Sequence, residues 1–372
     1  MEKTALYIHI PFCKQKCLYC DFPSFANNEN LMEQYIIALN IEIKKVADKK
    51  ISTIFIGGGT PTYLNLQCLK NLKEILKNLN LSKQVEFTIE GNPGTFTKEK
   101  LKVLKDMGVN RLSIGLQSVQ DSLLKTLGRI HNYNDFLNSY NMSRSMGFNN
   151  INIDLMFGLP GQNVEMWKHS LEVIVDLNPE HLSCYSLILE KGTPFFNKYD
   201  EMDLPDEDVV SEMYSITKEF LSKNGYFQYE ISNFSKKGLE CKHNLTYWNL
   251  QNYIGIGSGA HSYYDGIRYR NESNVKKYIQ LIKEDNTAVV ENYTNTLEDE
   301  MEEFIFLGLR KIKGISIEEF KNRFRKDIFS IYSDVIEKYQ SLHMLIVEED
   351  RMYFSPRGME ISNYILSDFI NI

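Results

Sequence analysis

Short apolar runs alternate with longer amphipathic segments over the first half of the chain. Between candidate strands lie segments such as LMEQYIIALNIEIKKVA and KEKLKVLKDMG, in which apolar residues recur every three or four positions, as on one face of a helix. Repeated strand–helix units build a parallel sheet with right-handed crossovers. Six units fall short of the eight that close a barrel, so the predicted fold class is α/β, an open (β/α)6 partial barrel. The six candidate strands are ALYIHI, STIFIGGG, QVEFTIEGNP, RLSIGLQS, INIDLMFGLP and HLSCYSLI.

The strand–helix rhythm ends near residue 190, and two further regions follow. Residues 191–295 contain an acidic helical stretch and then an aromatic- and glycine-rich passage that includes HNLTYW. Residues 296–372 contain helical patterns, a short hairpin at MLIVEEDRMYFS and a last helix. We therefore predict a partial barrel over residues 1–190, a family-specific region over 191–295 and a small α+β accessory domain over 296–372.

Composition and charge exclude several classes of protein. With 43% hydrophobic and 24% charged residues, the chain has the composition of a globular protein. A formal net charge of -7 argues against a nucleic-acid partner. No run approaches the roughly 18 apolar residues of a membrane-spanning helix, so no transmembrane segment is expected, although peripheral membrane contact stays open. The N-terminus lacks the order of a secretory signal, which favours a cytoplasmic location.

Three of the six cysteines, Cys13, Cys17 and Cys20, lie close together directly after the first predicted strand. Thiolates spaced C-x3-C-x2-C on one loop can reach three corners of a [4Fe-4S] cubane and leave the fourth iron without a protein ligand. An open coordination position favours chemistry over electron storage. A zinc site completed by His9 is the alternative, but this spacing matches zinc sites poorly and no second cysteine pair follows.

Other unusual residues also follow predicted strands, at the edge where parallel α/β folds bind ligands. These motifs are GGGTPT, EGNP, GLQS and DLMFGLPG. The glycines of GGGTPT would let the backbone come close to a ligand. A second glycine motif, from Gly255 to Ala260, fits a dinucleotide fingerprint formally, but HSYYDG follows it where a helix should begin. Dinucleotide binding is therefore not expected.

Together these motifs resemble those of the radical SAM superfamily, and specifically the HemN/HemW family. YIHIPFCKQKCLYCDF is the most specific of them, and TIEGNP, RLSIGLQS, LGRIH, INIDLMFGLPGQ, YEISNF and HNLTYWN extend the resemblance over nearly the whole chain. The resemblance implies that S-adenosylmethionine (SAM) chelates the open iron through its amino and carboxylate groups. Motif matching implies a SAM site lined by Tyr7, Gly58, Gly59, Thr60, Glu90, Gln117, Arg129 and Asp154.

The resemblance implies two functions of different classes. One is the oxidative decarboxylation of coproporphyrinogen III, and the other is the binding of heme and its transfer to apo-heme acceptor proteins. Two departures disfavour the oxidase: Phe22 stands where those enzymes have a cysteine, and only twelve residues precede Cys13 where they have a longer extension. We expect a heme chaperone that carries a [4Fe-4S] cluster and SAM, without coproporphyrinogen oxidase activity. An unrelated radical SAM reaction is the third alternative.

The segment from Cys241 to Trp248 contains the pattern HNxxYW, which is proposed for heme contact in this family. A histidine can ligate heme iron, and Tyr247 and Trp248 would supply flat apolar surface for a porphyrin. His243 is therefore the predicted heme ligand, with a structural role in a core as the alternative. The remaining histidines are expected to be structural or exposed. A flavodoxin- or ferredoxin-type reductant is a further expected partner.

Overall fold

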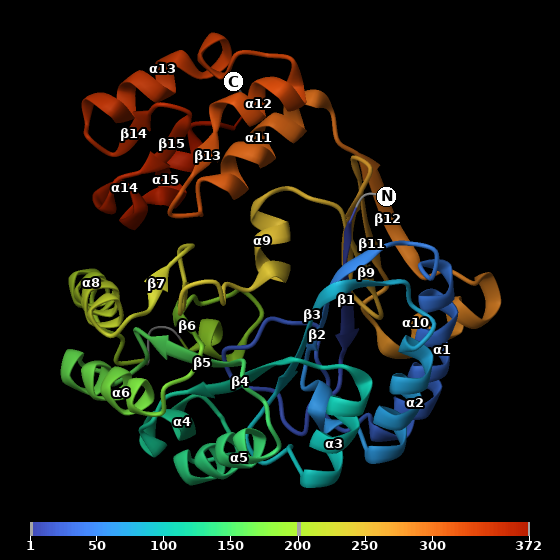
Figure 1. The fold of residues 1–372 in the computed structure, drawn as a ribbon. Coiled ribbons are helices and arrows are strands. Elements are labelled where there is room, and N and C mark those ends of the chain that lie inside the picture. The colour runs from blue at the N-terminus through green and yellow to red at the C-terminus, as the bar shows by residue number, and fades with distance from the viewer. Residues whose placement is uncertain (1–2, 199–201, 371–372) are drawn as a thin grey trace.

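The computed structural model describes residues 3–198 and 202–370. The six predicted strands form in the predicted order, and each pairs in parallel with the next. Figure 1 shows them as one curved, open sheet with helices along its outer face. The predicted partial (β/α)6 barrel is confirmed. The strands are β1 (Thr4–Ile10), β2 (Ile51–Gly58), β3 (Leu81–Gly91), β4 (Arg111–Gln117), β5 (Ile151–Phe157) and β6 (His181–Ser186).

Amphipathic helices cover the outer face of the sheet. Several begin at a side chain that accepts a hydrogen bond from a first-turn backbone N–H, as Asn65, Thr97 and Asn163 do. Apolar side chains such as Leu6 and Ile54 fill the layer between sheet and helices, while alternate positions face the concave side. The helices are α1 (Met32–Lys45), α2 (Leu66–Leu76), α3 (Lys98–Met107), α4 (Asp121–Thr126), α5 (Tyr133–Ser145) and α6 (Val164–Asp176), with short 3-10 turns η1 (Glu29–Leu31) and η2 (Pro61–Tyr63).

Residues from the second predicted region extend the sheet at both edges. β8 (Asn233–Ser235) and β7 (Phe227–Gln228) follow β6, while β9 (Tyr253–Ile256) pairs in parallel with β1. The turn after β9 leads to another strand, so the glycine motif there does not begin a strand–helix dinucleotide fold. The other elements are antiparallel β10 (His261–Tyr264), β11 (Ile267–Asn271) and β12 (Val289–Thr294), and helices α7 (Pro194–Asn197), α8 (Glu207–Lys223), α9 (Lys242–Trp248) and α10 (Val275–Asp285).

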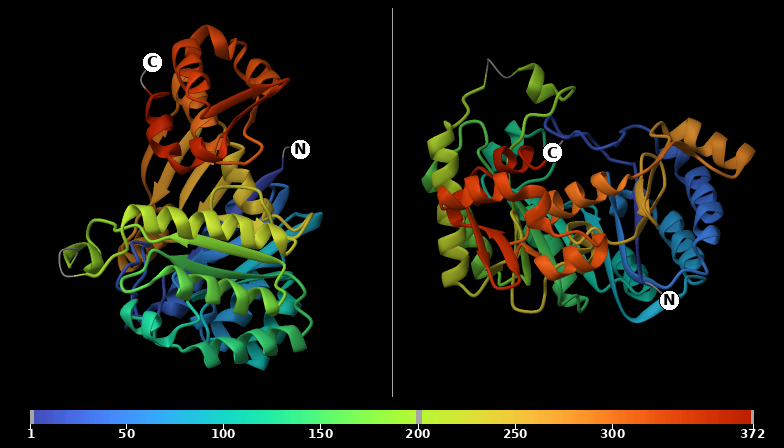
Figure 2. Two further views of the ribbon diagram at one scale, coloured as in Figure 1. Left: turned by 90° about the vertical axis from the view of Figure 1, so that its left-hand side faces the viewer. Right: turned by 90° about the horizontal axis from the view of Figure 1, so that it is seen from above.

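A second hydrophobic core lies in the C-terminal part of the chain, which Figure 2 shows as a lobe above the sheet. Leu250 and Tyr263 also belong to this core, so the lobe is packed against the strand extension. The predicted hairpin is confirmed, whereas the boundaries near residues 190 and 295 stay predictions. The lobe contains α11 (Leu297–Gly308), β13 (Ile315–Ser316), α12 (Ile317–Phe324), α13 (Ile328–Ser341), β14 (Leu345–Glu348), β15 (Arg351–Phe354), α14 (Pro356–Glu360) and α15 (Ser362–Ser367). Within the described ranges, no helix has both the length and the apolar character needed to cross a bilayer.

A buried carboxylate links the strand extension to the barrel. Glu42 on α1 accepts hydrogen bonds from the Gly257 N–H (2.8 Å), the Asn271 side-chain amide (2.8 Å) and the Tyr278 hydroxyl. Burial raises the pKa of Glu42, and these hydrogen bonds oppose the shift. The contacts join α1 to the turn after β9, to β11 and to α10, so they hold β9–β12 against β1.

Removing the Glu42 side chain should destabilise the protein, because it removes three buried hydrogen bonds and leaves the Gly257 N–H and the Tyr278 hydroxyl without their acceptor. We expect Glu42→Ala to lower the free energy of unfolding by about 3 kcal/mol. Glu172→Ala, at an exposed position of α6, is the matched control and should have little effect. Chemical denaturation measures both. A loss no larger than that of the control would show that the extension is held by other contacts.

Candidate metal and cofactor site

The loop that carries the three cysteines has its shape fixed by contacts with the rest of the protein. At its base Phe12 and Phe25 form a β-bridge, and the Cys13 N–H donates to the Phe25 carbonyl oxygen (3.1 Å). In the middle of the loop the Leu18 N–H donates to the Leu127 carbonyl oxygen (3.1 Å). The loop is thus organised by protein contacts before any metal binds.

All three cysteines on the loop are free thiols. Cys13 is buried, whereas Cys17 and Cys20 are partly exposed. Burial raises the pKa of the Cys13 and Cys20 thiols, so iron binding must release their protons. Within the described ranges, no three Cys, His, Asp or Glu side chains surround a position suited to one metal ion. A cubane makes a different demand, because each thiolate binds a different iron.

His9, the fourth ligand of the alternative zinc site, already has partners at both ring nitrogens. Its Nδ1 lies 3.0 Å from the Tyr7 hydroxyl, and its Nε2 lies 2.8 Å from the Pro23 carbonyl oxygen. The ring is buried, and burial lowers its pKa. A Cys3His zinc site would require His9 to give up one of these hydrogen bonds, so the donor set fits a three-cysteine cluster better.

Two glycines of GGGTPT leave room for neighbouring groups, Gly58 for the His9 ring on β1 and Gly59 for the cluster loop. Gly58 has φ +111°, and a Cβ there would lie 2.5 Å from Cε1 of His9. A Cβ on Gly59 would lie 2.9 Å from the Phe12 carbonyl oxygen and 3.0 Å from the Cys13 sulfur. A larger residue at Gly59 would push the loop outward, and one at Gly58 would displace the His9 ring, so both positions require glycine.

A chain of hydrogen bonds joins two of the cysteines across the strand ends. The Asn92 side-chain amide donates to the Thr60 hydroxyl (2.8 Å), which leaves the hydroxyl hydrogen free for the Cys13 sulfur 3.5 Å away. Arg129 donates to the Asn92 side-chain oxygen (2.8 Å) and to the Cys17 sulfur (3.4 Å). The charge of the Arg129 guanidinium therefore lies directly beside the predicted cluster, where it can also attract an anionic ligand.

The end of β4 is shaped to make room for this chain. A Cβ on Gly115 would lie 2.9 Å from the Asn92 side-chain oxygen and 3.2 Å from an Arg129 guanidinium nitrogen. Gln117 is 8% exposed and has φ +77°, at a register shift between β4 and β5. Such left-handed backbone at a non-glycine residue is concentrated at ligand sites. This backbone conformation places the buried side-chain amide of Gln117 beside Gly115, near Asn92 and Arg129.

Two buried acidic side chains lie on neighbouring parts of the sheet, Glu90 on β3 beside Gly58 and Asp154 on β5. Glu90 accepts a hydrogen bond from the Gly58 N–H (3.2 Å), and burial together with the charge of Asp154 raises the pKa of Glu90 to about 8. Asp154 accepts hydrogen bonds from Asn152 (2.7 Å) and Ser113 (3.3 Å), and burial raises its pKa also. An ammonium group or ligand hydroxyls would offset the cost of holding these carboxylates close together.

Of the eight predicted SAM residues, Thr60 and Arg129 contact cysteines of the cluster loop, and Glu90 is bonded to Gly58. Asp154 lies midway along β5, so a single SAM site formed by all eight stays a prediction. Asn92, which joins Thr60 to Arg129, was not among the predicted site residues. The signal was present, because Asn92 directly follows β3 within the motif EGNP. Its partner could not be identified without the fold.

His243 lies at the first turn of α9, with its ring centroid 6.5 Å from that of Tyr7 on β1. Its Nδ1 lies 2.8 Å from the Thr53 hydroxyl and its Nε2 lies 2.8 Å from the Tyr247 hydroxyl. Thr53 is four residues before Gly57 on β2, about 13 Å away at the rise of an extended strand. His243 is 1% exposed, and burial lowers its pKa to about 3. Ligation of heme iron by His243 would have to break one of these hydrogen bonds.

Comparison with known proteins agrees with this geometry. The family model of the radical SAM superfamily matches residues 7–174, and that of the HemN C-terminal domain matches residues 295–361. Coproporphyrinogen III oxidase (HemN) from Escherichia coli, a radical SAM enzyme, has the same fold. Its structure superposes with a TM-score of 0.87 over 100% of this chain and 91% of that one, at 24% sequence identity.

Closer relatives in sequence are proteins named heme chaperone HemW. The protein of Bacillus subtilis is 40% identical over 374 residues, which cover 98% of this chain and 99% of the relative. That of Lactococcus lactis is 38% identical over 372 residues, which cover 99% and 98%. With this similarity along its full length, and with the three-cysteine loop at the mouth of a partial barrel, the chain belongs to the HemW family of radical SAM proteins.

Proposed function

We propose that this protein is a heme chaperone that carries a [4Fe-4S] cluster and SAM and transfers heme to apo-heme acceptor proteins. The observation that carries the proposal is the 38–40% identity, over almost the whole chain, to two proteins named heme chaperone HemW. A cytoplasmic location is part of the proposal, because a reducing compartment keeps the cluster thiols free for iron.

In this proposal Cys13, Cys17 and Cys20 each hold one iron of the cluster. The fit rests on three free thiols carried by one loop whose backbone is fixed by the protein. When bound, the cluster supplies an open iron for SAM and a means of passing single electrons from a flavodoxin- or ferredoxin-type reductant. The residues of the chain provide the surroundings that orient SAM and hold its charged groups.

The proposed roles of the SAM residues follow from their chemistry. Arg129 keeps its charge beside Cys17 and pairs with the SAM carboxylate. Glu90 faces the amino group, next to the Gly58 backbone. Gln117 and Asp154 receive ribose hydroxyls. The remaining members, Tyr7, Gly59 and Thr60, line the site.

One side chain of the cluster loop favours heme transfer over the oxidase reaction. Phe22, which stands where the oxidases have a cysteine, is 59% exposed. The loop therefore presents an apolar ring to solvent at this position, and no thiol is available there for the oxidase chemistry. The fold that the chain shares with HemN does not decide between the two functions, because one fold can support both.

Parallel assays test the proposed function. The protein is reconstituted anaerobically with iron and sulfide and then given heme, with apo-myoglobin as the acceptor. We expect heme uptake followed by transfer, and no decarboxylation of coproporphyrinogen III above the rate without protein when SAM and a reductant are supplied. Sustained decarboxylation, or failure to take up heme, would refute the proposal. Cys17→Ala, which removes one cluster ligand, separates effects of the cluster from effects of heme binding.

The carboxyl group of Glu90 gives the protein a specific pH dependence. Its pKa of about 8 lies above the ordinary value of 4.5, so the folded state holds a proton that the unfolded state loses between these pH values. The stability of the protein without SAM should therefore fall as the pH rises from about 4.5 to about 8, and it should stay lower above that window.

Replacing Glu90 by glutamine should remove this dependence. At each pH the melting temperature of the unchanged protein is subtracted from that of Glu90→Gln. We expect this difference to be at least about 2 °C larger at pH 9 than at pH 5, a shift that roughly 1 kcal/mol produces in a chain of moderate size. Differential scanning fluorimetry at both pH values measures it. Glu172→Gln, on the exposed side of α6, should show the same difference at both. An equal difference for Glu90→Gln would mean that this carboxyl group titrates normally.

A further inference from the structure

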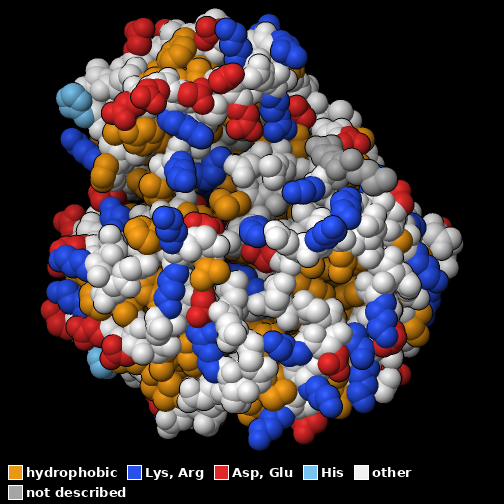
Figure 3. All heavy atoms as spheres, in the orientation of Figure 1, with side chains coloured by type: hydrophobic (Ala, Val, Ile, Leu, Met, Phe, Trp, Pro, Cys, Tyr) orange, Lys and Arg blue, Asp and Glu red, His pale blue; other side chains and the backbone are white. Residues whose placement is uncertain are grey.

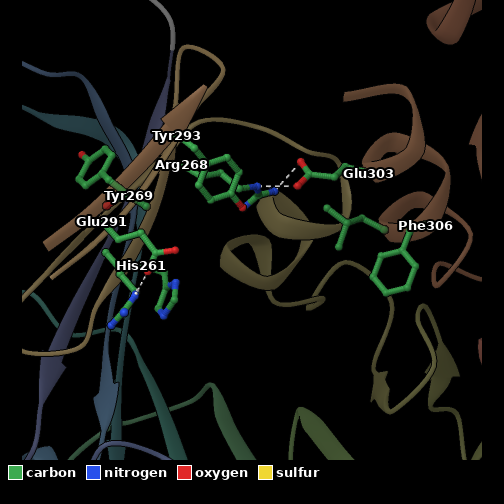
Figure 4. Close-up of a pocket in the computed structure, with 10 residues that line it drawn as sticks. His261, Arg268, Tyr269, Glu291, Tyr293, Glu303 and Phe306 are labelled. Carbon is green, nitrogen blue, oxygen red and sulfur yellow. Dashed lines mark hydrogen bonds and ion pairs between the residues drawn. The ribbon is translucent and has the colours of Figure 1, made fainter. Parts of the chain in front are cut away.

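A groove separates the strand extension from the first helix of the C-terminal lobe. It lies between β10–β12 and α11 (Figure 4). Its volume is about 420 Å³. A second hollow of about 310 Å³ shares Tyr293, Glu303 and Phe306 with the first and so continues it. Together they fall within the roughly 300–1,000 Å³ of sites that hold a large organic ligand.

One wall of the groove presents a histidine, two arginines and a tyrosine from the same face of the sheet. In the antiparallel register His261 lies opposite Arg270, and Arg268 lies opposite Tyr293. The opposite wall is α11, which contributes Glu303, Phe306 and Leu307. Tyr293 is 52% exposed and lines the groove, as does Phe306 of α11, so aromatic surface is open to a flat ligand.

His261 differs from the buried histidines of the chain in having an open ring. Among the described residues none makes a hydrogen bond to its imidazole, although the side chain lines the groove. Burial and the charges of Arg270 and Arg268 lower its pKa, so the ring is neutral and keeps a lone pair at physiological pH. The buried histidines, by contrast, all have ring partners: His9, His131, His181 and His243.

The charges in the groove suit a ligand with carboxylates at its edge. Arg268 on the sheet is paired with Glu303 of α11 through two hydrogen bonds of 2.6 Å, so this ion pair joins the two walls and leaves Arg268 without a free donor for a propionate. Arg270 is more exposed and uses only its Nε for Glu291, which leaves its two terminal nitrogens as donors. Figure 3 shows further Lys and Arg side chains along the seam between the C-terminal lobe and the barrel.

We infer that heme binds in this groove with the His261 imidazole as an axial ligand of its iron, with Tyr293 and Phe306 against the porphyrin and Arg270 toward a propionate. The inference rests on the proposed function and names the heme site that it requires. In the binding step a ring nitrogen of His261 donates its lone pair to ferric iron and displaces a water ligand, with no change of oxidation state. The site lies between two lobes of the protein, where a heme edge stays accessible to an acceptor.

Heme titrations followed by absorption spectroscopy test the inference on the full chain. We expect His261→Ala to change the Soret band of the heme complex and to weaken heme binding by about tenfold or more. Added imidazole should restore the band by occupying the vacated ligand position. His169→Ala, on the exposed face of α6, should behave like the unchanged protein. An unaltered Soret band in His261→Ala, or its loss in His243→Ala instead, would overturn the assignment.

A second variant tests the groove without removing the ligand. Leu307→Trp places a larger ring into the groove from α11 and should weaken heme binding although His261 is intact. If Leu307→Trp binds heme as well as the unchanged protein, or imidazole fails to restore the band of His261→Ala, the groove is not the heme site. If the unchanged protein binds no heme at all, the proposed function itself fails and this inference with it.

Discussion

The hydrogen-bonded chain from Cys13 through Thr60, Asn92 and Arg129 to Cys17 is the constraint on which the site depends. It joins the cluster loop to residues that follow β2, β3 and α4, so the position of the sulfurs is set by the register of the barrel. Thr60, Asn92 and Arg129 form the links of this chain, and few other side chains could make the same hydrogen bonds. The glycines beside it have no side chain because a Cβ would occupy the same space.

The motif HNxxYW lies toward the other end of the barrel, and its contacts there are structural. α9 has no side-chain cap of its own, and Glu86 on β3 instead accepts hydrogen bonds from the Lys242 and His243 N–H groups, each 3.0 Å away. A carboxylate there stabilises the helix N-terminus through its unpaired donors and its dipole. The ring of His243 is then held between Thr53 and Tyr247. His243 and Tyr247 of HNxxYW thus help to fix α9 against β2.

Sequence reasoning recovered the features that depend on local pattern. Strand–helix alternation predicted the six parallel strands, and the cysteine spacing predicted the loop. It could not identify Asn92 as the link between Thr60 and Arg129, because that pairing arises only where the ends of β2 and β3 meet the segment after α4. For the same reason the sequence did not distinguish His261 from the other unassigned histidines as a heme ligand. Its ring is open because β10, β11 and α11 meet at one groove. Long-range packing decided both.

The most direct test of the account concerns the iron that the three cysteines leave open. Electron paramagnetic resonance of the reduced, anaerobically reconstituted protein should show a cluster signal that changes when SAM is added. In Arg129→Lys, which keeps the charge but loses the planar donor fork, the same change should require about tenfold more SAM at an equal iron content. A signal that does not respond to saturating SAM in the unchanged protein would contradict the account.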